Sequence, residues 1–474
     1  MIFSQLQGWM FIALYAGLAI AIAQTYKKKA NTKESYLVAD RELNSTEAGF
    51  SIAATWIWAP ALFVASQQAY NNGWIGVFYF TVPNIATLVI FAYLGQKVRN
   101  KYKKAFTLSS TMEKMHSKRV QKVYIVSLSA LSICSFAVQL LAGGAVVHSL
   151  TGIDFIYITF AMALIAVGYS YNSGLGASVR TDYLQMGIIA GVAILLVPWL
   201  LAEVGFDTFK AGLNGFDGLA TNMFTGKGVD IFYGFGISVT IGLLSGSFGD
   251  QSFWQRAYAT KKDEVKTAFI KGAAIFGVVP ILMSVFGFVA AGSGFVPESN
   301  QLVNVETVLN FLPQWTAIPF LIALLSGLIS TLDSCLCAIS SLVGEDLTTN
   351  EGEVVDNAKK GMILLVIFGL VVANIPNMEI VYLFLFYGTL RAGTLIPTLL
   401  TIIGLEKKDV KPSEKGMFWG ILSGLALGLP LYMVGRFTDV NADLMWIGTC
   451  VTCFLPGFVA YLSSKNGQKV IYYS

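Results

Sequence analysis

The chain has 474 residues, of which 55% are hydrophobic and 13% are charged. This composition excludes an ordinary soluble domain and is typical of an integral membrane protein. The net charge of +4 comes from basic residues in short loops between apolar segments, so nothing in it indicates nucleic-acid binding.

Cutting the chain at charges and turns predicts thirteen transmembrane helices. The first, 4–24, lacks a basic start and a cleavage site, so we interpret it as a retained helix and not as a signal peptide. Residues 48–96 contain no charge and are too long for one helix, so Asn71-Asn72-Gly73 is predicted to divide them. The other spans are predicted at 123–148, 154–171, 179–202, 231–250, 270–292, 315–344, 360–375, 379–404, 416–434 and 444–463.

The distribution of Lys and Arg supports this odd number of spans. Loops predicted to face the cytoplasm hold 28 of the 32 basic residues, including those of segment 256–271. The outer loops hold three, namely Lys210, Lys227 and Arg436. The positive-inside pattern therefore predicts an outer N-terminus and a cytoplasmic C-terminus, in a plasma or inner membrane.

Three charges lie clearly within predicted spans: Asp182, Asp333 and Arg391. Ionisable groups at membrane depth are costly, and they are functional candidates by default. The alternative is a structural ion pair between Arg391 and one of the two aspartates.

The span 315–344 carries an unusual polar face. At 100° per residue, five positions fall within an arc of roughly 160°, namely Gly327, Ser330, Thr331, Asp333 and Ser334. Such an oxygen-rich face suits a hard cation such as Na⁺. Alternatively, the small hydroxyl residues only help helices to pack closely.

Two spans contain helix-breaking signals. Pro60 removes a backbone donor, so the helix is expected to open around Thr55–Ala59 and free carbonyls near the membrane centre, where transporters with broken helices bind coupling ions. A simple proline kink is the alternative. Ser245–Gly249 is a matching irregularity five spans later. Two five-span units must have opposite orientation, which predicts an inverted repeat.

At these residues the chain resembles the sodium/solute symporter family, whose members share the inverted-repeat fold of the bacterial leucine transporter. The resemblance covers nearly the whole chain and rests on four motifs: Ser173–Gln185, Gln251–Ala257, Ser330–Ser334 and Ala53–Trp56. With the span count, it implies an all-α membrane protein with a single transporter domain over 1–474. The expected parts are a leading helix (4–24), two repeats with broken first and sixth core helices (47–202 and 231–404), and two peripheral helices (416–463).

The resemblance also implies a sodium site. In the family, carbonyls of the broken first helix and a carbonyl and two hydroxyls of the eighth hold one sodium, and the matching positions are Ala53, Trp56, Gly327, Ser330 and Thr331. Some members hold a second cation nearer the cytoplasm, and the positions that match it are Asp182, Asp333 and Ser334. Two-sodium members carry Ser where this chain has Asp333, so a second sodium, a proton or a structural pair stays open.

The expected solute follows from two strings, A-T-W-I-W-A-P-A-L and F-G-D-Q-S-F-W-Q-R-A, which look most like the urea and polyamine branch of the family. Urea or a related small nitrogen compound is therefore expected, with proline, a sugar, a short carboxylate or a nucleobase as alternatives. Trp58 is predicted to stack on a small planar solute, unless Trp56 and Trp58 only pack the bundle. Arg391 would favour an anionic solute, which argues against urea. Candidate polar liners are Thr55, Tyr79, Asn84, Ser247 and Gln251.

These features predict a sodium-driven uptake symporter that works by alternating access. Its expected partners are a small polar solute, Na⁺ as coupling ion and the lipid bilayer, with no organic cofactor and with a monomer sufficient for function. A membrane sensor and a passive channel for a neutral solute are alternatives. An enzyme is disfavoured, because no His, Cys or paired-carboxylate group with catalytic spacing occurs.

Overall fold

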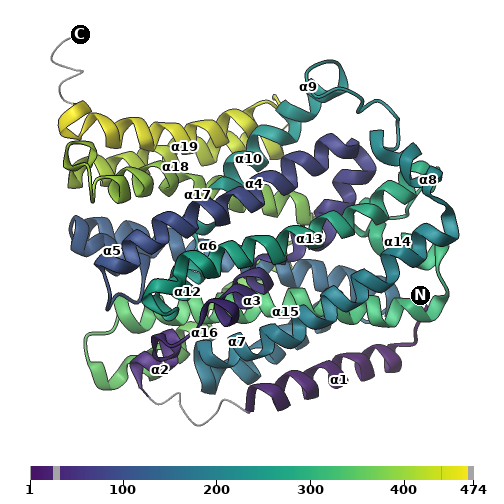
Figure 1. Ribbon diagram of the computed structural model, residues 1–474, viewed down its shortest axis with the longest axis horizontal. Helices are drawn as coiled ribbons and strands as arrows, with labels where there is room; N and C mark the ends of the chain where they lie inside the picture. Colours follow the sequence, from purple (N-terminus) through teal and green to yellow (C-terminus); the bar gives the residue numbers. More distant parts are fainter. Residues whose placement is uncertain (1, 25–31, 439, 468–474) are drawn as a thin grey trace.

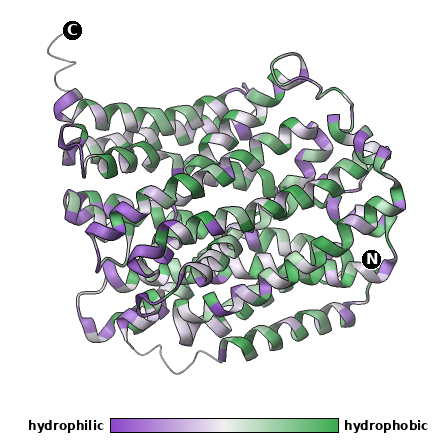
Figure 2. Cartoon of the chain, in the orientation of Figure 1, coloured by the Kyte–Doolittle hydropathy of each residue, from purple (hydrophilic) through white to green (hydrophobic). Residues whose placement is uncertain are grey.

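The computed structural model describes residues 2–24, 32–438 and 440–467. Regular structure in these ranges is helical, apart from one isolated bridge between Leu43 and Thr260. Within the described residues, ten helical segments are long and apolar enough to cross a membrane. They run side by side, with hydrophilic residues gathered mostly at the two ends of the bundle (Figures 1 and 2). The protein is therefore an all-helical membrane bundle.

The helices fall into three groups by length. The long helices are α1 (Gln5–Gln24), α4 (Ala65–Lys101), α6 (Lys118–Thr151), α7 (Phe155–Val204), α13 (Val265–Gly292), α15 (Ala317–Ser341), α16 (Val354–Ala373), α17 (Ile380–Ile403), α18 (Glu414–Phe437) and α19 (Leu444–Leu462). The short ones are α2 (Lys33–Val38), α3 (Ser45–Trp56), α5 (Leu108–Met115), α8 (Phe206–Ala211), α9 (Lys227–Ile231), α10 (Ile237–Leu244), α11 (Gly246–Gly249), α12 (Gln251–Ala259) and α14 (Val303–Phe311). Single π and 3-10 turns join them: η1 (Ala39–Arg41), η2 (Pro60–Val64), η3 (Gly212–Asn214), η4 (Phe232–Gly236), η5 (Lys262–Glu264), η6 (Asn300–Leu302), η7 (Gln314–Thr316), η8 (Leu342–Asp346), η9 (Glu351–Glu353) and η10 (Lys408–Val410).

Two of the ten segments, Pro60–Lys101 and Phe155–Val204, are far longer than one crossing requires, at 42 and 50 residues. Each contains one glycine that leaves helical geometry: Gly73 with φ 57° and ψ −152°, and Gly174 with φ 59° and ψ −151°. Glycine adopts this left-handed region without the steric cost that a Cβ imposes. The predicted division at Asn71-Asn72-Gly73 is confirmed, whereas the total of thirteen helices stays a prediction.

The first predicted helix break is confirmed. Asn44 and Glu47 form a capping box that starts α3, and the helix ends at Trp56. Ile57 has φ −84° and ψ 71°, and η2 begins at Pro60. The N–H of Ala59 donates to Gln139 Oε1 (2.7 Å), outside any helical ladder. The chain therefore opens at Ile57 and Trp58, which is more than a proline kink.

The second break lies one residue beyond the predicted stretch Ser245–Gly249. Asp250 is extended, with φ −118° and ψ 121°, and its Oδ1 caps α12 by accepting from Ser252 N (2.8 Å). Gly246 and Gly249 let neighbours approach this segment closely. A Cβ at Gly246 would collide with the Trp56 ring, and one at Gly249 would lie 2.9 Å from Arg391 Cβ.

Helix α15 is the centre of the bundle, since 94% of its most apolar stretch is buried. It packs against α7, α6 and α3. By contrast, α18 and α19 pack on each other and on α17 and are 33% and 39% buried, at one edge of the bundle (Figure 1). Helix α1 lies at the opposite edge, against α7.

Candidate ion and solute site

The polar face of α15 lies against the break that follows α3. Thr331 Oγ1 lies within hydrogen-bond distance of the carbonyl oxygens of Gly327 (3.2 Å) and Thr55 (3.3 Å). A Cβ at Gly327 would lie 3.0 Å from the carbonyl oxygen of Ile57, so glycine allows this close approach. Carbonyl and hydroxyl oxygens from two helices therefore meet at one place, and these are ligands that a hard cation prefers.

The other predicted sodium positions lie close by, but their polar atoms have partners. Ser330 Oγ donates to Asp182 Oδ1 (2.6 Å). The carbonyl of Ala53 accepts from Ile57 N (2.9 Å), and Trp56 is the last residue of α3. The predicted sodium positions offer only oxygen atoms as ligands, which fits sodium. The Ser330 hydroxyl can still offer a lone pair to the cation.

Arg256 is a charge that the sequence analysis misplaced. It was counted in the cytoplasmic segment 256–271, but α12 enters the bundle and the side chain is fully buried. Its Nη2 lies 3.5 Å from Asp182 Oδ2 and donates to Ser334 Oγ (2.7 Å). Its Nε donates to Ser51 Oγ (2.9 Å) and its Nη1 to the carbonyl of Ser252 (3.2 Å). The assignment of Arg256 to a loop was therefore wrong.

Asp182 and Asp333 are both buried where α7 meets α15, but they have different partners. Asp182 accepts from Ser51 and Ser330 and pairs with Arg256. Four hydroxyls surround Asp333: Tyr169 (2.5 Å), Ser178 (2.7 Å), Thr181 (3.3 Å) and Ser334 (3.3 Å). Ser334 contacts both Arg256 and Asp333, so it connects the two carboxylate environments.

Arg391 does not pair with either aspartate, so the proposed Arg391–aspartate ion pair was wrong. Its Nε donates to the carbonyl of Gly242 (2.6 Å). Its guanidinium carbon lies 5.3, 5.6 and 4.5 Å from the ring centres of Trp56, Trp58 and Tyr387. Helix α17 packs against η2, α10 and α11, which flank the two breaks, and Arg256 is the arginine that meets Asp182.

The two tryptophans form an aromatic layer beside Arg391. Their rings stack at 5.5 Å with 15° between the planes. Trp58 also meets Phe384 and Tyr387 edge-on, each at 5.3 Å. Trp56 Nε1 donates to the carbonyl of Asn84 (3.3 Å), whereas Trp58 Nε1 is buried and has no hydrogen-bond partner among the described residues.

The remaining predicted liners divide into two groups. Asn84 lies beside Trp56, and Ser247 contacts Thr87 near the second break. Thr55 Oγ1 lies 3.0 Å from Ser334 Oγ and so belongs to the ion network.

Gln251 and Tyr79 lie elsewhere. Gln251 uses both amide atoms to hold the segment before α5, through Leu108 N (3.0 Å) and the carbonyl of Phe106 (3.1 Å). Tyr79 packs against Phe232 and Phe78, apart from the tryptophan layer. The lining role of Gln251 and Tyr79 stays a prediction.

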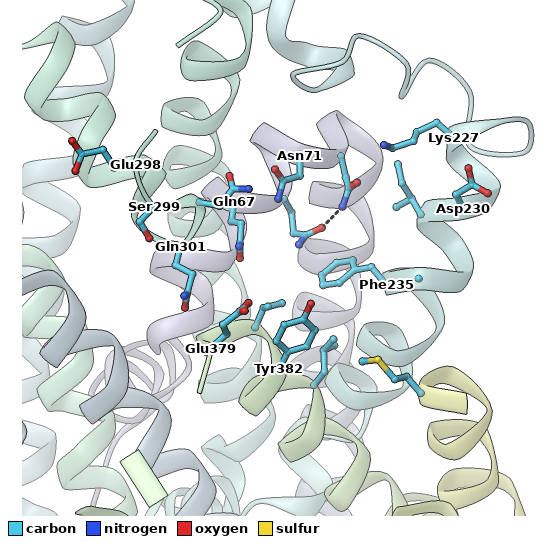
Figure 3. Close-up of a pocket in the computed structure, with 18 residues that line it drawn as sticks. Gln67, Asn71, Lys227, Asp230, Phe235, Glu298, Ser299, Gln301, Glu379 and Tyr382 are labelled. Atoms are coloured by element: carbon cyan, nitrogen blue, oxygen red, sulfur yellow. Dashed lines mark hydrogen bonds between the residues drawn. The ribbon is translucent and has the colours of Figure 1, made fainter. Parts of the chain in front are cut away.

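A polar pocket of about 690 Å³ opens at the end of the bundle that bears α9, opposite α2 and α5 (Figures 1 and 3). Side chains from α4, η4, the segment 298–301 and α17 surround it, including Gln67, Asn71, Glu298, Gln301, Glu379 and Tyr382 (Figure 3). Leu385 also lines it and is the neighbour in sequence of Phe384, whose ring contacts Trp58. Neither Arg391 nor Trp58 lines this pocket.

Comparison with known proteins identifies a family and relatives that this chain resembles. The sequence profile of the Sodium:solute symporter family matches residues 36–424. The chain is 21% identical over 95% of its length to the Urea-proton symporter DUR3 of Oryza sativa subsp. japonica, of which the match covers 68%. It is 25% identical to the Sodium/pantothenate symporter of Haemophilus influenzae, over 98% of this chain and 96% of that protein.

A solved Na⁺-coupled sialic acid symporter in its substrate-bound outward-open state has a similar fold. The TM-score is 0.78 at 17% identity, over 96% of each chain. The family profile covers more than half of the chain, and the helical bundle has the fold of that solved symporter. The protein is an integral membrane transporter and not an enzyme, and it belongs to the sodium:solute symporter family.

Proposed function

We propose that this chain imports a small polar solute together with sodium, by alternating access. The sodium ion would bind where α15 meets the break after α3, at Ala53, Trp56, Gly327, Ser330 and Thr331. The observation that carries this proposal is the position of Thr331 Oγ1 within 3.3 Å of carbonyl oxygens from both helices. A cation bound there would join α15 to the broken helix, so its release would free the two to separate.

The predicted architecture extends this proposal. Segments 47–202 and 231–404 would form two inverted repeats whose relative movement exposes the site alternately on each side. The leading helix 4–24 and the peripheral helices 416–463 would lie outside this core. The basic loops support an outer N-terminus and a cytoplasmic C-terminus. One chain contains all the residues named, so a monomer would suffice.

A second cation site is proposed around Asp182, Asp333 and Ser334. Arg256 already supplies a positive charge to Asp182, whereas the bonds to Asp333 come from neutral hydroxyls. Two buried carboxylates repel each other unless a cation or a proton compensates them. Asp333 is therefore the group whose charge would follow ion binding and release, through either a second sodium or a proton.

The proposal also includes the identity of the solute and the place where it binds. The resemblance favours urea or a related small nitrogen compound, and one relative is named a urea-proton symporter while another is named for pantothenate. The solute would lie between the broken segments, beside Trp58, Asn84 and Ser247. Trp58 provides a flat apolar face on which a planar solute can stack.

Uptake into proteoliposomes tests the sodium coupling. An inward sodium gradient should drive accumulation of a labelled solute above its external concentration, and an equal potassium gradient should not. Urea, proline, a sugar, pantothenate, a short carboxylate and a nucleobase form the first panel. Equilibration without accumulation under every gradient would instead identify a passive channel, and binding without movement would identify a sensor.

A further inference from the structure

Arg391 is a buried cation whose charge the protein does not neutralise by direct pairing. The side chain is fully buried, and among the residues described Nη1 and Nη2 have no hydrogen-bond partner. Its Nε bond goes to a neutral carbonyl, that of Gly242. An unpaired charge inside a membrane protein is costly and marks a position where a counter-charge binds.

The nearby carboxylate of Asp250 lies within electrostatic range of Arg391, but both of its oxygens accept hydrogen bonds from other groups. Asp250 Oδ1 caps α12 through Ser252 N (2.8 Å), and Oδ2 accepts from the Tyr387 hydroxyl (2.7 Å). The ion pairs found among the described residues do not include one between Asp250 and Arg391. Instead, Tyr387 stands between them, with its ring 4.5 Å from the guanidinium carbon.

The free polar atoms around this position are mostly donors. Trp58 Nε1 is unpartnered like the two Nη atoms of Arg391, and the Trp58 ring lies 5.6 Å from the guanidinium carbon. Two parallel guanidinium N–H groups match the two oxygens of a carboxylate, which they bind bidentately. Urea offers one carbonyl oxygen and otherwise only N–H donors, so it would satisfy these groups poorly and leave the positive charge unbalanced.

We infer that the transported solute carries a carboxylate, which Arg391 binds through Nη1 and Nη2 while the rest of the solute stacks on Trp58. This inference rests on the proposed symport function, and it replaces urea as the expected solute. A carboxylate that enters with sodium also brings a charge that balances the coupling ion.

The surroundings of Arg391 support a built site. Gly242 fixes the guanidinium through Nε, and Gly249 allows the second broken segment to lie against the Arg391 backbone and Cβ. The polar pocket of Figure 3 is lined by other residues, and its charged side chains are mostly acidic, namely Asp230, Glu298 and Glu379. An acidic pocket is a poor site for an anion, so the carboxylate is assigned to Arg391 and Trp58, which do not line that pocket.

Paired probes that differ only in charge test this inference. Propionate and propionamide, pyruvate and pyruvamide, and benzoate and benzamide are compared with urea, as substrates in sodium-driven uptake and as ligands that change tryptophan fluorescence in detergent. The carboxylate of at least one pair should bind at least tenfold more tightly than its amide. If no carboxylate exceeds its amide, or if urea binds best, the inference is overturned.

Variants of Arg391 locate the effect. Arg391→Gln should abolish the preference for carboxylate, and Arg391→Lys should keep the charge but raise the half-saturating concentration about tenfold, because the planar fork is lost. Arg119→Gln is the matched control, since its guanidinium also lies over an aromatic ring, that of Phe418 at 3.9 Å, but outside the site. A carboxylate preference that survives in both Arg391 variants contradicts the inference.

Sodium coupling and the carboxylate site can be contradicted by different results. Uptake of a carboxylate that depends on Arg391 but is equal in sodium and potassium would remove sodium coupling and keep the carboxylate site. Sodium-driven uptake of urea that is unchanged by Arg391→Gln would keep sodium coupling and remove the carboxylate site. A cooperative melting transition in detergent, measured without sodium or solute, checks that each variant is folded.

Discussion

Two arginines, Arg256 and Arg391, are equally buried in this bundle but have opposite surroundings. Every nitrogen of the Arg256 guanidinium has a partner: Ser51, Ser252, Ser334 or Asp182. Arg391 has one hydrogen bond through Nε and otherwise faces three aromatic rings. Burial of a charge therefore does not by itself indicate its role. A saturated arginine holds the protein together, whereas an unsaturated one is available to a ligand.

The largest expected effect is on stability. Arg256→Gln leaves the buried Asp182 without its cation, which typically costs about 3–5 kcal/mol. Arg391→Gln should leave the protein as stable as before, or more stable, because it removes an unpaired charge. The buried free cysteines Cys134, Cys335 and Cys337 allow the melting temperature to be followed with a thiol-reactive dye.

A second substitution makes this comparison sharper. Asp182→Asn added to Arg256→Gln should recover part of the lost stability, because the unpaired carboxylate is gone. Equal melting temperatures for the single Arg256 and Arg391 variants would contradict the distinction between the two arginines.

The second prediction concerns solute binding beside Arg391. Trp58→Ala removes the stacking face and the indole N–H, and it should raise the half-saturating solute concentration about tenfold, or about 1.4 kcal/mol. Sodium binding without solute should persist, because the Trp58 side chain stacks on the Trp56 ring, whereas Trp56 is proposed to bind sodium through its backbone carbonyl and Thr331 bonds to Thr55 and Gly327. Unchanged solute affinity in Trp58→Ala would make Trp58 a packing residue.

The third prediction concerns Asp333, on the side of Arg256. Asp333→Asn keeps most of the bonding capacity toward Tyr169, Ser178 and Thr181, so the protein should fold. The ion-to-solute ratio or the pH dependence of uptake should change, because a charge that responds to the ion is gone. Reversal-potential measurements in proteoliposomes give the ratio. An identical ratio and pH profile would exclude Asp333 from coupling.

Local signals in the sequence were enough to predict the helix breaks. Pro60 disfavours helix before it, and the chain opens at Ile57 and Trp58 as expected. Gly73 interrupts its helix where the Asn-Asn-Gly signal lies. The hydroxyls of α15 were also found, because helical periodicity alone puts Ser330, Thr331 and Ser334 on one face.

The partners of charged side chains could not be predicted in the same way, because they depend on how distant helices pack. Arg256 follows an apolar segment and precedes a basic one, so its sequence position resembles a loop, yet α12 carries it inside. Arg391 lies in an apolar span, and nothing local shows that it faces Trp56 and Trp58 instead of Asp182. Gln251 has polar neighbours on both sides, and only the packing of α5 assigns its amide to Leu108.

The most direct test of sodium coupling measures how uptake depends on sodium concentration in Ser330→Ala with Thr331→Ala. The account predicts that the half-saturating sodium concentration rises at least tenfold, because two oxygens of the site are removed. Ser340→Ala is the matched control, since among the described residues this buried hydroxyl of α15 bonds only to the carbonyl of Cys337 in its own helix. An unchanged sodium dependence in the double variant would contradict a sodium site between α15 and the broken helix.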